Sequence, residues 1–216
     1  MKKVLLNRKR EALRRAAMAL AALLVMNHVM HIGMPLPRLA YHKLEERAGV
    51  GWTQVVKRAW VPDIGKTHIA YLSGDETATV FGSVSFSLYG WMPYFGTALD
   101  CSTGEPLYAG YNQMSREDGL AWFFFGRVDD PEIKEIDISV CDTAYDSESH
   151  AYAGEEFFRQ KAELMERGGR RYFFLQTSVV MDSTETRPMP MVIGYDGNGN
   201  AMLKYDIEEG SYSHFG

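Results

Sequence analysis

The chain has 216 residues, of which 46% are hydrophobic and 12% aromatic, enough for one globular domain with a substantial core and an appendage. Charge is unevenly distributed: residues 1–15 contain seven basic residues and one acidic residue, yet the whole chain carries −5, so residues 16–216 carry −11. This balance argues against a nucleic-acid surface on the main domain, and we expect no nucleic-acid partner.

The basic start leads into an apolar segment, residues 16–37. Its first eleven residues are all apolar, and the 21 residues from Ala16 to Leu36 would span about 31 Å as a helix, roughly one bilayer core. We therefore predict a single transmembrane anchor over residues 16–37. Because basic residues stay on the cytoplasmic side, residues 1–15 form a cytoplasmic tail and the C-terminal part lies outside the cell membrane.

A cleaved signal peptide is the alternative, because the unbroken apolar run is short and Asn27 follows it. Residues 26–38 lack the spaced pair of small residues that cleavage requires, which favours an uncleaved anchor. His28 and His31 lie on one helical face, where they could bind a metal or respond to pH. Polar residues at the headgroup boundary are the simpler interpretation.

Residues 38–65 are predicted to be a stalk between the anchor and the domain. A short helical pattern at residues 40–47 is followed by two glycines, and a proline and a further glycine precede the next apolar run. The extracytoplasmic domain is therefore predicted to cover residues 66–216.

Beyond residue 65 the apolar runs are short, rich in β-branched and aromatic residues, and bounded by turn residues. In residues 136–140 apolar side chains alternate with polar ones, which is typical of a half-buried antiparallel strand. We predict a mainly β, antiparallel β-sandwich-like domain. The predicted strands are residues 67–74, 77–91, 106–112, 119–128, 133–140, 170–181, 189–196 and 201–207.

Three connecting segments allow two interpretations each. Asp129–Glu132, with the sequence DDPE, is predicted to be a turn, although its acids could hold a cation. Residues 155–169 carry helix start and stop signals, but RGGR at residues 167–170 is also a good hairpin turn, and we favour the hairpin. Asp196–Asn200, DGNGN, has oxygen ligands at calcium-loop spacing but lacks the required glycine and glutamate, which favours a turn.

The layout resembles uncharacterised, single-pass membrane-anchored extracytoplasmic proteins of Gram-positive bacteria. The resemblance covers most of residues 66–208. It implies a compact antiparallel β-domain outside the membrane and no particular activity. The motifs that carry it are a Gly90-Trp91 pair, the turn at residues 125–134, the GRRYFF strand at residues 169–174 and the closing YDGNG hairpin at residues 195–199.

Catalytic motifs are absent from the sequence: it has no HExxH, no G-x-S-x-G and no CxxC. His68 and His150 lie near acids, so a His/Asp/Ser site could assemble only in space. We predict no catalytic, cofactor-binding or metal-binding residues. Cys101 and Cys141 form a possible disulfide in an oxidising location, and two free thiols are the alternative.

Two function classes follow. The first is a membrane-anchored extracytoplasmic interaction or sensory module, in which exposed aromatic residues such as Tyr89–Gly96, YGWMPYFG, engage an envelope protein or a small molecule. The alternative is a cell-envelope hydrolase whose site the sequence does not reveal. A pocket that collects titratable groups would favour the hydrolase, and a shallow apolar patch would favour the interaction module.

Overall fold

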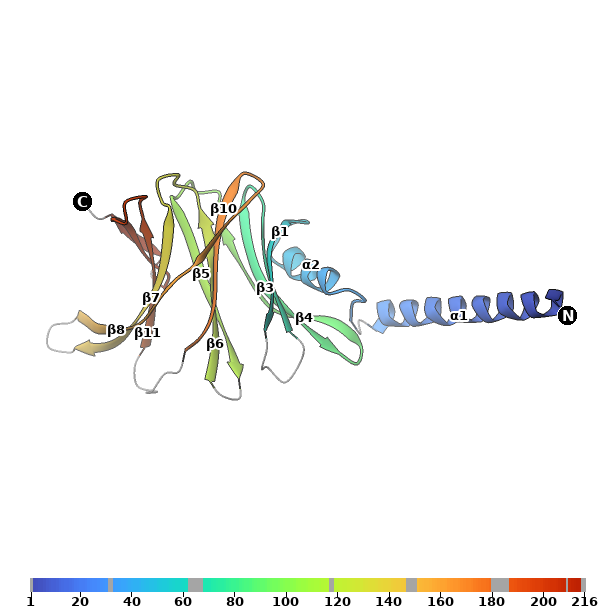
Figure 1. Ribbon diagram of the computed structural model, residues 1–216. Coiled ribbons are helices and arrows are strands. Elements are labelled where there is room, and N and C mark those ends of the chain that lie inside the picture. The colour runs from blue at the N-terminus through green and yellow to red at the C-terminus, as the bar shows by residue number, and fades with distance from the viewer. Residues whose placement is uncertain are drawn as a thin grey trace.

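The structure is a computed structural model, and it describes residues 2–30, 33–61, 68–116, 119–146, 151–179, 187–208 and 210–214. A long helix projects from a β-domain, and a short second helix packs against that domain (Figure 1). The helices are α1 Lys2–Met30 and α2 Pro37–Arg47. The strands are β1 Gln54–Val61, β2 His68–Gly74, β3 Ala78–Ser87, β4 Gly90–Asp100, β5 Leu107–Arg116, β6 Gly119–Val128, β7 Glu135–Asp146, β8 Ala151–Lys161, β9 Glu163–Arg167, β10 Arg170–Val179, β11 Arg187–Tyr195, β12 Ala201–Asp206 and β13 Ser211–His214.

The strands form three antiparallel sheets. Sheet A has the strand order β1-β2-β3-β4, sheet B the order β5-β6-β10-β9, and sheet C the order β13-β12-β11-β7-β8. Each pair of hydrogen-bonded neighbours runs antiparallel. The prediction of a mainly β chain with antiparallel sheets is therefore confirmed.

Sheet B is the central layer of the stack. On β6, Trp122 and Phe124 pack into a core shared with sheet C, while Phe123 and Phe125 pack into a core shared with sheet A. All four side chains are fully buried. The run AWFFFGRV therefore shows no alternation of polar and apolar residues, because both faces of this strand meet an apolar layer.

Sheet A is also covered on both faces, by sheet B and by α2. Ile69 and Tyr71 of β2 face α2, whereas Ala70 and Leu72 face sheet B. Two polar contacts join the edges of sheets A and B: Lys57 to Glu163 at 2.6 Å, and Asn112 Nδ2 to Thr97 Oγ1 at 2.7 Å. These contacts bring β1 beside β9 and β5 beside β4.

The predicted stalk is instead part of the domain. Residues 37–47 form α2, as the helical pattern at residues 40–47 indicated, and residues 54–61 form the first strand of sheet A. Tyr41 and Leu44 of α2 are buried against β2 and β3. The sequence suggested a linker because only one face of this short helix is apolar, and the surface that it covers lies further along the chain.

The first helix, α1, includes the basic start and residues 16–30 of the predicted transmembrane anchor. In the described part of the chain, no helix combines the length and the apolar character that crossing a bilayer requires. The predicted transmembrane helix over residues 16–37 is therefore not supported. Asn27 interrupts its apolar run, and its last residues belong to other structures, since Met34 pairs with Trp91 and Pro37 begins α2.

The segment that fitted both a helix and a hairpin is extended. Residues 151–161 form β8, and β9 pairs with β10 across the turn Arg167-Gly168-Gly169-Arg170. Gly168 and Gly169 have φ values of 59° and 73°, which a primed two-residue turn requires and which glycine adopts without strain. The favoured hairpin is confirmed.

The possible disulfide does not form in the structure, because Cys101 and Cys141 are both free thiols. Cys101 follows β4 of sheet A, and Cys141 lies on β7 of sheet C, with sheet B between them. Stacked sheets lie about 10 Å apart. A disulfide tolerates a Cα separation of only about 7 Å, so these two residues cannot be bridged without opening the stack.

We expect both thiols to be free in the purified protein, even after air oxidation. Alkylation under denaturing conditions, without prior reduction, should add two labels per chain in an intact-mass measurement. Cys101 should react only after unfolding, because the thiol is buried and burial raises its pKa. A chain that gains both labels only after reduction would contradict this layer assignment.

Candidate functional site: an uncharged aromatic hairpin

The hairpin of β3 and β4 exposes a cluster of large apolar side chains. Leu88 is 100% exposed at its tip, and Tyr89 beside it is 65% exposed. We call the cluster the hairpin patch and define it by six exposed residues. They are Leu36, Phe86, Leu88, Tyr89, Met92 and Tyr94.

The hairpin patch differs in charge from the other turns that the structure describes. Residues 85–96, SFSLYGWMPYFG, contain no charged side chain. The other described turns between strands contain acidic residues or, in the β9–β10 turn, are flanked by arginines. Exposed apolar clusters of this kind mark interaction sites in soluble domains, because they serve no purpose in packing the core.

The base of the hairpin is firmly held, although its tip is exposed. Phe86 packs on Trp91 with ring centroids 5.2 Å apart, and Trp91 itself packs against the α2 side of sheet A. Within the turn, the Ser87 hydroxyl accepts a hydrogen bond from the Tyr89 amide and donates one to the Gly90 carbonyl, each at 3.2 Å. The tip is thus presented by an ordered support.

The segment after α1 is clamped to this hairpin. Met34 and Trp91 exchange two backbone hydrogen bonds, at 2.7 and 2.8 Å. The backbones approach so closely that a Cβ added to Gly33 would lie 2.7 Å from the Tyr89 carbonyl oxygen, and one added to Gly90 would lie 2.8 Å from that of Met34. Both glycines also have positive φ, so two features require glycine at these positions.

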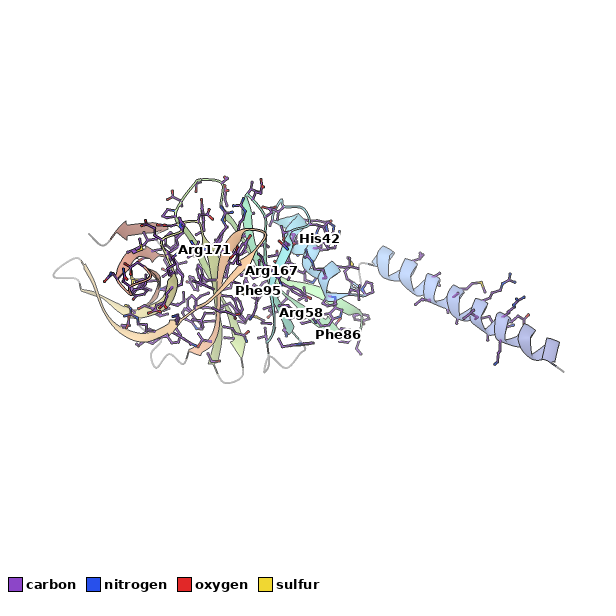
Figure 2. The ribbon with its side chains drawn as sticks, turned by 45° about the horizontal axis from the view of Figure 1, so that its top comes forward. His42, Arg58, Phe86, Phe95, Arg167 and Arg171 are labelled. Carbon is purple, nitrogen blue, oxygen red and sulfur yellow. The ribbon has the colours of Figure 1, made fainter. Side chains whose placement is uncertain are left out.

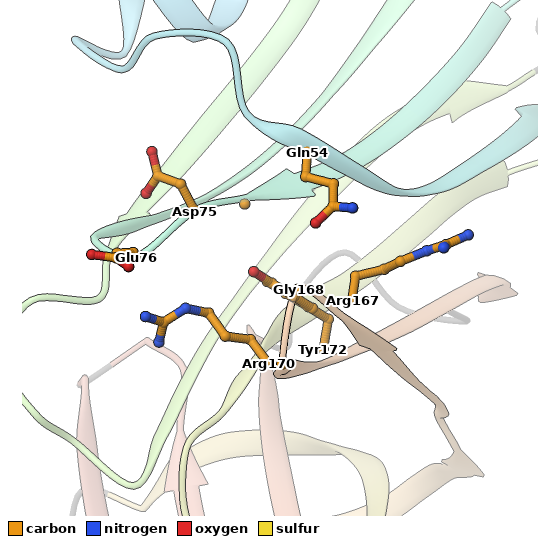
Figure 3. A pocket seen from close by; sticks show the side chains of 9 residues that line it. Gln54, Asp75, Glu76, Arg167, Gly168, Arg170 and Tyr172 are labelled. Atoms are coloured by element: carbon orange, nitrogen blue, oxygen red, sulfur yellow. The ribbon is translucent and has the colours of Figure 1, made fainter.

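A pocket of about 390 Å³ lies at the opposite end of the sheets, between the β2–β3 turn and the β9–β10 turn. Figure 3 shows Gln54, Asp75 and Glu76 on one side of it, and Arg167 and Arg170 on the other. A pocket that collects titratable groups is the feature expected of a hydrolase.

Asp75 and Tyr172 are the lining residues whose pKa values are shifted. Burial raises the pKa of Asp75, but hydrogen bonds from the amides of Thr77 and Ala78 and from the Thr77 hydroxyl outweigh it and hold the pKa below its usual value. Burial raises the pKa of Tyr172, so its phenol stays neutral. The described lining contains no Ser, Thr, Cys or His, so it holds no Ser-His or Cys-His pair of the kind that acyl transfer uses.

A buried polar cluster beneath α2 also brings together serine, histidine and an acid. Glu45 is fully buried; its Oε2 accepts a hydrogen bond from Arg38 at 2.8 Å and lies 3.0 Å from His42 Nδ1. Its Oε1 accepts hydrogen bonds from the Thr53 hydroxyl and, at 3.1 Å, from Ser73. The acid therefore lies between serine and histidine, whereas acyl transfer requires histidine between serine and acid.

This cluster attaches α2 to sheet A. Tyr41 of α2 donates a hydrogen bond to the Val80 carbonyl of β3 at 2.8 Å, and Arg38 donates one to the Thr53 carbonyl at 2.8 Å. Burial alone would raise the pKa of Glu45, but the hydrogen bonds from Arg38, Thr53 and His42 outweigh it and lower the pKa. Glu45 is thus ionised and paired, which suits a structural role.

Of the four histidines selected from the sequence, the structure describes the side chain of His68. His68 is buried, with its ring edge-on to Tyr94 at 5.0 Å. His31 and His150 lie outside the described residues, and the structure describes the backbone but not the side chain of His28. Among the described residues, no group of three or more His, Cys, Asp or Glu side chains could hold a metal ion.

Both acidic connections are turns, as predicted. Asp129 pairs with the buried Arg127, whose guanidinium also donates to the Cys101 carbonyl at 2.9 Å. The Asp196 carboxylate accepts hydrogen bonds from the amides of Asn198 and Asn200, each at 2.8 Å, within the β11–β12 turn. These bonds engage the carboxylate oxygens, and the absence of calcium binding stays a prediction.

No family model matches the chain, and no curated protein or solved structure matches it either. The resemblance drawn from the sequence motifs thus gains no support from these comparisons. The candidate site rests on the geometry of the molecule itself, and the hairpin patch is an exposed apolar surface in the described part of the chain that packing does not explain.

We expect Glu45→Gln to destabilise the protein, because it leaves the Arg38 guanidinium without its counter-charge. Breaking a buried pair costs about 3–5 kcal/mol, and the loss should fall at or below that range because Arg38 is 26% exposed. Urea denaturation over a pH series measures the effect.

The pH dependence of the stability difference shows whether the charge of Glu45, and not only the shape of its side chain, stabilises the protein. Because folding lowers the pKa of Glu45, its stabilising effect is complete above its unfolded pKa of about 4.3 and is lost as the pH falls through the lower folded value. The stability difference between parent and Glu45→Gln should therefore shrink in acid. A variant as stable as the parent at neutral pH would show that the cluster does not hold α2.

Proposed function

We propose that the chain is a non-catalytic interaction or sensory module attached to a membrane, and that the hairpin patch is its binding surface. The observation that carries this proposal is the uncharged tip at residues 85–96, with Leu88 fully exposed on an ordered base. A surface leucine and several surface aromatic residues are unfavourable in water unless a partner covers them, and each fully covered side chain would contribute about 1.5–3 kcal/mol.

The proposed location rests on the sequence. Seven basic residues precede eleven consecutive apolar ones, a pattern that favours attachment to the cell membrane through residues 16–37, with the basic tail in the cytoplasm and the β-domain outside. The resemblance to membrane-anchored extracytoplasmic proteins agrees with this location.

A hydrolase is not adopted as a second candidate. The described lining of the pocket beside Arg167 and Arg170 has no Ser-His or Cys-His pair, and the cluster around Glu45 has its acid in the position that acyl transfer assigns to histidine. An interaction surface needs neither feature.

Photocrosslinking in cells that make the chain tests the proposal. A benzophenone amino acid at position 89 should give a covalent adduct on illumination, because Tyr89 lies in the surface that the partner covers. The matched control carries the same group at Asn198, which is exposed in the polar β11–β12 turn, and should give no adduct. Equal labelling at both positions, or none at position 89, would refute the hairpin patch as the binding surface.

A further inference from the structure

The hairpin patch lies close to the end of α1. Met34, which is hydrogen-bonded to Trp91 of the hairpin, is four residues beyond Met30, the last residue of the helix. Four extended residues reach at most about 14 Å. Any surface that holds residues 16–30 must therefore lie within that distance of the base of the hairpin.

We propose that the hairpin patch enters the headgroup region of the lipid bilayer to which residues 16–30 of the N-terminal segment attach the chain. This inference rests on the proposed function, and it names the partner of the same surface. The hairpin and the N-terminal segment then form two contacts with one membrane, which fix the orientation of the β-domain on it.

The chemistry of the tip fits lipid headgroups. Tyrosine and tryptophan side chains concentrate at membrane interfaces, where an apolar ring meets lipid and a polar edge meets water, and the exposed Tyr89 and Tyr94 supply such groups. Because residues 85–96 carry no charge, insertion removes no ionised group from water. Leu88 projects from a convex tip, which suits a soft bilayer better than a small molecule, since small-molecule sites are concave.

The neighbouring strand adds an exposed ring on the Phe86 face of the hairpin, whereas Met92, which pairs with Ser85, lies on the other face. Trp60 of β1 is 57% exposed, and the register Trp60–Ile69–Val84 places it on the sheet face that also carries Phe86. The Arg58 guanidinium lies 5.6 Å from the Trp60 ring centroid. Figure 2 shows Arg58 and Phe86 on the part of the domain nearest α1. A guanidinium beside an uncharged aromatic surface can bind lipid phosphates while the rings enter the interface.

The opposite end of the sheets is polar, and its pocket is lined by Asp75 and Glu76 together with Arg167 and Arg170. Strand β3 runs from the Asp75-Glu76 turn to the hairpin tip, and its ten residues span about 34 Å. With the hairpin in the headgroups, the pocket beside Asp75 faces away from the membrane.

Fluorescence of the full-length chain on lipid vesicles tests the inference. The background is Cys101→Ser with Cys141→Ser, and a single cysteine is introduced at Leu88→Cys and labelled with the environment-sensitive dye NBD. The matched control is Asn198→Cys with the same label. Vesicles of equal parts phosphatidylcholine and phosphatidylglycerol are prepared with and without brominated acyl chains, and thermal unfolding verifies that both labelled proteins are folded.

We expect the protein to float with the vesicles, the label at position 88 to shift its emission to the blue, and brominated lipid to quench it several-fold more strongly than the label at position 198. Protein that floats while both labels stay equally exposed to water would overturn the bilayer contact and leave the proposed attachment intact. Protein that fails to float would overturn the attachment, and the bilayer contact with it. Crosslinks from position 89 to protein alone, in the cellular experiment, would replace lipid with a protein partner.

Discussion

The structure depends on the burial of sheet B on both faces. Its strand β6 places Trp122 and Phe124 against sheet C and Phe123 and Phe125 against sheet A, so adjacent residues of one strand belong to two different cores. Each fully buried aromatic side chain contributes about 1.5–3 kcal/mol. Sheet B thus supplies the apolar surface against which the facing sides of sheets A and C are buried.

That constraint determines where function can reside. Apolar residues of the β-domain are largely used in the two cores around sheet B and in the layer beneath α2, where Tyr41 and Leu44 pack. The pocket between the β2–β3 and β9–β10 turns is polar. Its Asp75 carboxylate accepts a hydrogen bond from the Thr77 amide of the same turn. The hairpin patch is an exposed apolar surface that none of these layers covers, and it adjoins the segment that leaves α1.

Local patterns in the sequence predicted the elements whose signals are local. The strands at residues 119–128 and 170–179, the RGGR hairpin and the DGNGN turn all carry their own turn residues or β-branched and aromatic runs. The layer order could not be read in this way, because β6 and β7 are consecutive along the chain but lie in different sheets. The sequence of α2 and β1 suggested a stalk for the same reason. Nothing in their own residues shows that β1 pairs with β2 or that α2 packs on β2 and β3.

The candidate site was partly foreseen. Residues 89–96 were selected as exposed aromatics, and Tyr89, Met92 and Tyr94 are exposed, whereas Phe95 packs into the core between sheets A and B. The contribution of Leu36 and Phe86 was missed, because they lie outside that run and join it only through the Met34–Trp91 pairing and the strand register. Cys101, Cys141 and His68 formed no site among the described residues, because the chemical type of a side chain does not show which sheet it lies on or whether it is buried.

The claim that the hairpin patch serves binding and not folding is tested most directly by its contribution to stability. Urea denaturation of the double variant Leu88→Ser with Tyr89→Ser should give a free energy of unfolding within about 0.5 kcal/mol of the parent, because both side chains are exposed. Phe124→Ala, in the core of sheet B, should cost about 3–5 kcal/mol in the same measurement. A loss of several kcal/mol in the double variant would contradict the account, since the patch would then be part of what holds the domain together.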